Sequence, residues 1–167
     1  MQSNQRMKIY FLAALLFFSV GSSAQHNWDS KDWNKESLGF GCSVDGQMTK
    51  PVLRMTEFFM KKRFDKIRLL LDSDLPVDQY LATITLEKLK AKKELEITDD
   101  ELKRIKEIKE SEQLVPFCSG CTLWTVIPLK DLFDEKTKGI VSASADNWFD
   151  TYYKIYYKKG KNKQNDN

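Results

Sequence analysis

Three cysteines, Cys42, Cys118 and Cys121, are the residues of this 167-residue chain with the greatest capacity for chemistry. A thiolate can act as a nucleophile, as a metal ligand or as one half of a disulfide, and the redox compartment decides between these roles. Cys118 and Cys121 have the C-x-x-C spacing of dithiol oxidoreductases and of many zinc sites, whereas Cys42 is distant in the sequence. The role of these cysteines therefore depends on whether the protein resides in a reducing or an oxidising compartment.

Residues 1–24 indicate that the chain is exported. Two basic residues precede an uncharged, almost wholly apolar run of twelve at residues 9–20, and a small-x-small pattern follows it. A bilayer-spanning helix needs about 20 apolar residues, so cleavage near Ala24-Gln25 is favoured over a retained membrane anchor. We expect a periplasmic or extracellular protein with no transmembrane segment in the mature chain.

Export favours a structural disulfide between Cys42 and either Cys118 or Cys121, because free thiols are uncommon in oxidising compartments. Closing a loop of about 76 to 79 residues would stabilise the fold by about 4 to 5 kcal/mol in the chain-entropy model. One cysteine would be left over. The glycines at positions 39 and 41 predict a turn beside Cys42 that lets the backbone approach a neighbour closely.

Two other cysteine sites stay open. A redox pair at Cys118 and Cys121 needs a thiol of lowered pKa, usually at a helix N-terminus, but residues 122–127 resemble a strand rather than a helix. A zinc site could combine the three cysteines with the single histidine, His26. His26 lies near the expected mature N-terminus, where an ordinary exposed histidine is the favoured interpretation. We expect no metal and no cofactor.

The elements that must position the cysteines are mostly helical. Apolar residues recur three and four positions apart over much of residues 50–157, which predicts antiparallel helical hairpins in a single small, mainly α domain. Pro51 and Pro76 suit first helical turns, and Thr98 to Glu101 has the pattern of a capping box. A short irregular or β segment, with a strand at residues 123–127, follows the C-x-x-C motif.

Other segments flank or end these helices. Residues 25–49 are polar and contain glycine, which predicts an extended arm pinned by aromatic side chains, with disorder up to Phe40 as the alternative. Asp72-Ser73-Asp74 offers cap oxygens to the helix that starts with Pro76, and Ser144 or Asp146 offers one to the last helix. Residues 158–167 predict a disordered tail.

Residues 50–112 resemble a HEAT-type helical repeat. The likeness rests on consecutive antiparallel helix pairs, on the proline that starts a second helix, and on the apolar pattern from Tyr80-Leu81-Ala82 to Leu89. The resemblance implies a concave binding surface rather than an active site. It covers part of the chain only, since no repeat recurs at a fixed period and stable solenoids usually need three or more units.

Charge and composition exclude several classes of function. Without the expected signal peptide the chain carries 25 basic and 24 acidic residues, because two of its 27 basic residues precede position 24. This near neutrality argues against nucleic acid as a partner. One histidine gives a Ser-His-Asp or Cys-His hydrolase little to build on, and no phosphate-binding glycine pattern is present. An enzyme is therefore less favoured than a binding protein.

Aromatic residues of the last expected helix are the main binding candidates. At helical spacing they form two adjacent stripes, Trp148-Tyr152-Tyr156 and Phe149-Tyr153-Tyr157. Tyrosine and tryptophan suit wet interfaces, and lysines follow, so a peptide, a glycan or an anionic surface could bind there. The alternative is that one stripe packs on the domain. The helical face from Phe58 to Tyr80 is a second candidate surface.

These observations predict an exported, non-catalytic module that binds a protein or peptide partner. A thiol–disulfide oxidoreductase at Cys118 and Cys121 is the alternative from a different class. An immunity or inhibitor protein would also fit the size and build of the chain.

Overall fold

The structure, a computed structural model, describes residues 36–134, 139 and 141–158, with the backbone alone at 156–158. The expected signal peptide and its cleavage near Ala24-Gln25, His26, the side chains of Tyr156 and Tyr157, and the tail after residue 158 lie outside the described part. The inferences made on them stay predictions.

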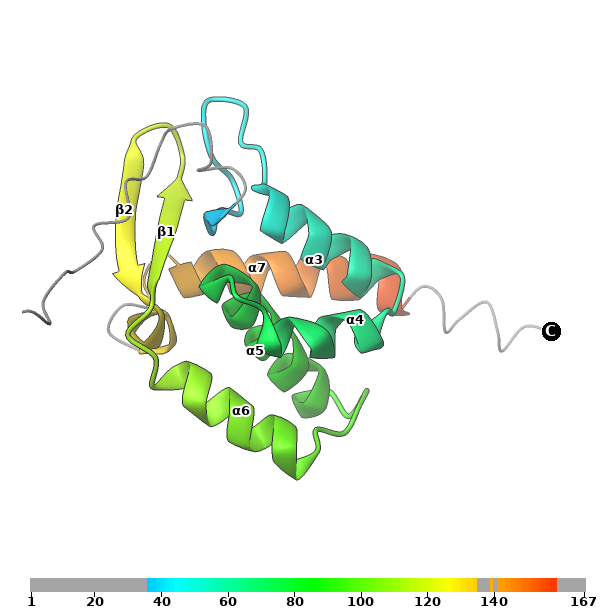
Figure 1. Ribbon diagram of the computed structural model, residues 1–167. Helices are drawn as coiled ribbons and strands as arrows, with labels where there is room; N and C mark the ends of the chain where they lie inside the picture. Colours follow the sequence, from blue (N-terminus) through cyan, green and yellow to red (C-terminus); the bar gives the residue numbers. More distant parts are fainter. Residues whose placement is uncertain (1–35, 135–138, 140, 159–167) are drawn as a thin grey trace, which may run out of the picture.

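The described chain is mainly helical with one antiparallel pair of strands, which confirms the predicted fold class (Figure 1). The α-helices are α3 (Lys50–Met60), α4 (Phe64–Leu69), α5 (Pro76–Ala91), α6 (Asp99–Lys109) and α7 (Val141–Tyr152). The strands are β1 (Leu114–Ser119) and β2 (Leu123–Pro128). Two 3-10 turns, η1 (Leu70–Asp72) and η2 (Leu129–Phe133), and a π-helical segment, η3 (Tyr153–Lys158), complete the chain order.

Helix α5 lies between α3 and α6, while the β1–β2 hairpin lies at one end of the helices (Figure 1). Helix α5 contributes more buried apolar residues to the core than any other element, because its apolar side chains extend over most of its circumference. Leu81 and Leu86 are fully buried. Since burying one such side chain contributes about 1.5 to 3 kcal/mol, α5 is the main stabilising element of the domain.

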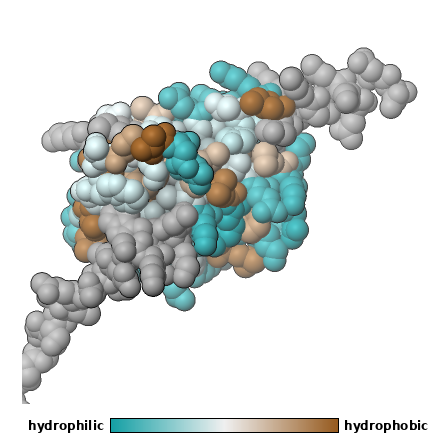
Figure 2. Space-filling model, turned by 90° about the horizontal axis from the view of Figure 1, so that it is seen from above, coloured by the Kyte–Doolittle hydropathy of each residue, from teal (hydrophilic) through white to brown (hydrophobic). Residues whose placement is uncertain are grey.

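Apolar residues on the face seen in Figure 2 are scattered in small patches among hydrophilic ones. Such scattering is ordinary for a protein surface and marks no interface by itself. Within the described ranges, the structure has no helix that is both long enough and apolar enough to cross a membrane.

Three of the predicted helix starts are confirmed. Pro51 and Pro76 lie in the first turns of α3 and α5, where the missing N–H of proline leaves no bond unmade. Helix α6 begins with the predicted capping box. The Glu101 N–H donates to Thr98 Oγ1 at 3.3 Å, and the Thr98 N–H donates to Glu101 Oε2 at 2.8 Å.

Two predicted caps are wrong. Leu75, not a residue of Asp72–Asp74, precedes α5, and it makes no side-chain cap bond. Ser73 instead accepts from the Leu75 N–H at 3.2 Å and donates to the Asp78 carboxylate at 3.1 Å, so its hydroxyl shapes the loop. Ser144 and Asp146 cannot cap α7, because the helix already begins at Val141.

The arm and the hairpin form the second part of the fold. Strand β2 was predicted and β1 was not; their ladder runs from Leu114 opposite Pro128 to Ser119 opposite Leu123. The arm lies parallel to β1 on its other side: the Leu38 N–H donates to Pro116 O at 2.7 Å, and the Cys118 N–H donates to Leu38 O at 2.9 Å. The end of the arm is therefore held by strand-like backbone bonds.

Candidate functional site

A disulfide joins Cys42 of the arm to Cys118 of β1, with their Cα atoms 5.7 Å apart. This Cα separation lies within the usual range for disulfides, about 4.4 to 6.8 Å. The sequence left open whether Cys42 pairs with Cys118 or with Cys121, and in the structure it pairs with Cys118. Cys121 is an exposed free thiol.

Gly39 is required by this disulfide. A Cβ at this position would lie 2.1 Å from Cys42 Sγ and 2.4 Å from Cys118 Sγ, both far inside van der Waals contact. The predicted close approach of the glycine backbone to a neighbour is confirmed at Gly39, and the neighbour is the sulfur pair. At Gly41 the nearest atom to such a Cβ is 3.6 Å away, so that glycine is not forced by space.

The C-x-x-C motif forms the turn of the hairpin. Cys118 lies opposite Trp124 in the ladder, and Gly120 adopts a φ of +59° just before Cys121. No helix begins at the motif, so neither Cys118 nor Cys121 lies at the helix N-terminus that usually stabilises a thiolate. Among the described residues no group of three or more His, Cys, Asp or Glu side chains could hold a metal ion; His26 lies outside them.

The aromatic stripes of the last helix face inward over much of their length. Trp148, Phe149 and Tyr153 are 5 %, 0 % and 8 % exposed. The Trp148 Nε1–H donates to Thr56 Oγ1 at 2.8 Å, and the Phe149 ring stacks on Phe59 with centroids 5.0 Å apart. These three binding candidates are therefore part of the core. This agrees with the alternative interpretation, in which stripe residues pack on the domain.

Tyr152 is the stripe residue that stays half-buried at the surface. It lines a shallow hollow of about 380 Å³ between the arm and α7, together with Phe40 and the polar side chains of Asn147 and Thr151. The second candidate surface, from Phe58 to Tyr80, is also largely internal, since Tyr80 is only 1 % exposed. Sequence periodicity located these helix faces but did not separate core from surface.

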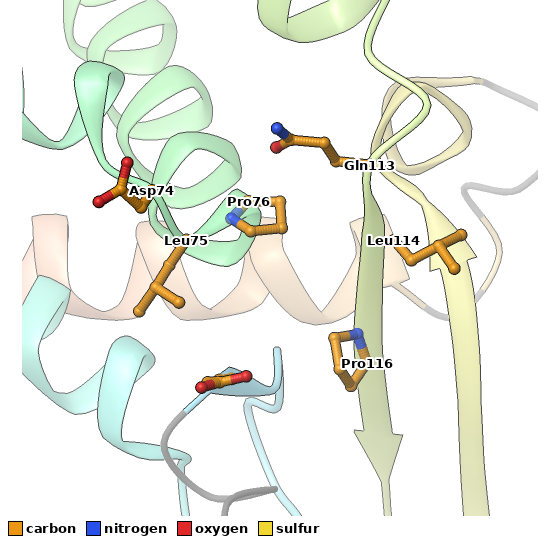
Figure 3. A pocket seen from close by; sticks show the side chains of 7 residues that line it. Asp74, Leu75, Pro76, Gln113, Leu114 and Pro116 are labelled. Atoms are coloured by element: carbon orange, nitrogen blue, oxygen red, sulfur yellow. The ribbon is translucent and has the colours of Figure 1, made fainter. Parts of the chain in front are cut away.

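A groove of about 350 Å³ lies between the start of α5 and strand β1 (Figure 3). We call it the β1 groove. Its lining is mostly apolar, with two carboxylates and one amide. The lining residues are Glu36, Asp74, Leu75, Pro76, Gln113, Leu114 and Pro116. In Figure 3 Leu75 and Pro76 come from the α5 side, and Leu114 and Pro116 come from β1.

The backbone of Leu114 is turned toward this groove. In an antiparallel ladder, alternate residues direct both N–H and C=O to the partner strand. Cys118 and Pro116 direct theirs to the arm, so Leu114, two residues before Pro116, directs its polar groups to that same side. The arm bonds to β1 only from Pro116 onward among the described residues, and Leu114 is therefore an open stretch of strand edge.

The walls of the groove are held by specific contacts. On the α5 side, the Arg54 guanidinium donates to both oxygens of the buried Asp78 carboxylate at 2.5 and 2.6 Å, which ties α3 to the start of α5. On the β1 side, Leu38 is fully buried and fixes the arm next to Glu36. The groove contains the carboxylates of Glu36 and Asp74, and none of its described lining residues is a lysine or an arginine.

Comparison with known proteins identifies no relative. No family model, no curated protein and no solved structure matches the chain. The HEAT-type resemblance of residues 50–112 therefore stays a prediction, and the site is interpreted from its own chemistry.

Sequence reasoning missed the β1 groove, although two signals pointed to it. Pro116 interrupts an apolar run, and a proline within a strand marks an edge or an irregular pairing. In Asp74-Leu75-Pro76 the residue before the proline is extended and precedes the helix, so the Leu75 side chain stays half-buried. The missing information was which two segments, distant in sequence, would lie side by side.

Proposed function

We propose that this protein is an exported, non-catalytic binding module that holds an extended segment of a partner protein in the β1 groove. The observation that carries the proposal is the open strand edge at Leu114 within an apolar groove that bears two carboxylates. Export rests on the signal-like residues 1–24, and a disulfide is compatible with an oxidising compartment.

The partner would bind by addition of a strand. Its backbone would exchange hydrogen bonds with the N–H and C=O of Leu114, which supplies affinity with little dependence on sequence. Apolar side chains would contact Leu75, Pro76 and Pro116. Lysine or arginine next to them would meet the carboxylate of Asp74, so that the groove selects a segment that is both apolar and basic.

The disulfide supports such binding without taking part in it. It fixes the arm against β1, and the arm carries Glu36 at the edge of the groove. A wall that is ordered before binding reduces the conformational entropy lost when the partner binds. An immunity or inhibitor protein would be a special case of this function, with an enzyme as the partner.

Selection of short random displayed peptides on the purified chain tests the proposal. We expect enriched peptides to alternate apolar residues with lysine or arginine, and to bind an Asp74→Lys variant about tenfold more weakly because the charge is reversed. Leu69→Lys is the matched control, since Leu69 is an exposed leucine that is not among the described residues of the groove lining. Enrichment of the same peptides by Asp74→Lys would contradict the proposal.

One observation favours a second function, a thiol–disulfide oxidoreductase: Cys121 is an exposed thiol within C-x-x-C. The bond from Cys118 to Cys42 and the absence of a helix at the motif oppose it. Reductase and isomerase assays with Cys121→Ser as the control decide the matter. Exchange activity that needs Cys121 would favour the enzyme over the binding module.

A further inference from the structure

A further cavity, of about 320 Å³, is lined by residues of α5, α6, η2 and α7. We call it the Tyr80 pocket. Its volume is at the lower end of the range for small-molecule sites, about 300 to 1,000 Å³. The described lining residues of the Tyr80 pocket and of the β1 groove do not overlap, so the two sites can be tested separately.

Tyr80 is the unusual group in this pocket. The side chain is 1 % exposed and its ring packs on Phe133 with centroids 5.1 Å apart. No described residue forms a hydrogen bond with the Tyr80 hydroxyl, and its oxygen is not one of the fully enclosed polar atoms that lack a partner, so the hydroxyl opens on the pocket. Burial, with the negative charge of Asp146, raises the pKa of Tyr80. The hydroxyl therefore keeps its proton at physiological pH and can donate a hydrogen bond to an acceptor inside the pocket.

The described lining of the pocket carries two lysines and two carboxylates. Lys88 Nζ lies 2.5 Å from Asp146 Oδ1, and Lys109 Nζ lies 2.6 Å from Glu87 Oε1. The two ammonium groups also lie over aromatic rings, Lys88 at 5.4 Å from the centroid of Phe149 and Lys109 at 5.6 Å from that of Phe133. These contacts hold the cations in place.

From these contacts we propose that the Tyr80 pocket binds a free α-amino acid with an apolar side chain. The ligand carboxylate would accept from the Tyr80 hydroxyl and lie near the lysines, and its ammonium group would lie near Glu87 and Asp146. A ligand with a single net charge would face as many repulsive groups as attractive ones, whereas a zwitterion satisfies both kinds. The apolar side chain would contact Ile84 and Leu132 on the pocket wall.

Calorimetric titration of the purified chain with leucine and with phenylalanine tests the inference. N-acetyl-leucine and leucinamide, which each lack one charge, serve as matched probes. We expect the free amino acids to bind, and each derivative to bind at least about tenfold more weakly because one charge is left unpaired. No binding of either amino acid, or equal binding of the derivatives, would overturn the proposal.

Tyr80→Phe is the decisive variant, because it keeps the ring and removes a hydroxyl that has no described protein partner. We expect an unchanged midpoint of thermal unfolding without ligand and an affinity for leucine lower by about ten- to a hundredfold. Asp74→Lys in the β1 groove should leave leucine binding unchanged. Unaltered leucine binding by Tyr80→Phe, or a lower unfolding midpoint without ligand, would contradict the role given to the hydroxyl.

Discussion

The arm–hairpin region and the helical region of this protein are stabilised in different ways. Helices α3 to α7 pack apolar side chains around α5, with ion pairs at the surface. The arm and β1 bury Leu38, Val115 and Phe117 in that core and add a short backbone ladder and one covalent bond, whereas β2 leaves its apolar side chains largely exposed, namely Leu123, Trp124 and Val126. A region with a small share of the core can still present a defined groove when it is cross-linked to its neighbour.

The largest expected effect comes from removing the cross-link. Cys42→Ala with Cys118→Ala should lower the free energy of unfolding by about 4 to 5 kcal/mol, because the open chain gains denatured-state entropy. Chemical denaturation measures the loss, and Cys121→Ala is the control that should change little. Native circular dichroism should keep the helical signal. Loss of that signal would mean that the two regions are not stabilised separately.

A core substitution in α5 should act on the helical region instead. Leu81 is fully buried, so Leu81→Ala should cost about 3 kcal/mol through lost burial and a residual cavity. The matched control is Leu69→Ala, since Leu69 is 64 % exposed. Hydrogen exchange should rise throughout the helices in the Leu81 variant. Faster exchange restricted to the arm would contradict the division between the regions.

Gly39→Ala tests whether the two sulfur atoms are what excludes a side chain at position 39. The added methyl group would overlap both sulfur atoms, so we expect a loss of about 1 to 3 kcal/mol from overpacking. The same substitution in the double-alanine variant at positions 42 and 118 should cost clearly less, because the sulfurs are absent. A double-mutant cycle measures this difference. Equal losses in the two backgrounds would mean that the sulfur pair is not what excludes a side chain.

The smallest expected effect depends on pH and concerns only the helical region. Burial acts to raise the pKa of Glu101, but hydrogen bonds from Arg68 and Thr98 lower it below its ordinary value of 4.5. A carboxylate with a lowered folded-state pKa stabilises the fold above its unfolded pKa, and that stability is lost as the pH falls through the folded pKa. Glu101→Gln should therefore flatten the acid limb of the stability curve. An unchanged acid limb would contradict this contribution.

The sequence predicted the helical region better than the arm–hairpin region. The period of apolar residues, Pro51, Pro76 and the Thr98 capping box depend on neighbours within a few positions, and each was confirmed. Which half of the aromatic stripes is buried, and which cysteine bonds Cys42, depend on distant segments. Strand β1 was not predicted, because a proline such as Pro116 usually interrupts a strand. The Pro116 carbonyl nevertheless accepts a hydrogen bond from the Leu38 N–H.

The bond between Cys42 and Cys118 also imposes an order on biogenesis. A chain made from its N-terminus presents Cys42 first, and helices α3 to α6 must be synthesised before Cys118 follows. Until then the Cys42 thiol has no disulfide partner. Cys121 follows Cys118 by three residues and offers Cys42 an incorrect partner. Oxidative folding of this protein should therefore depend on disulfide isomerisation, and the arm should be the last segment to reach its native position.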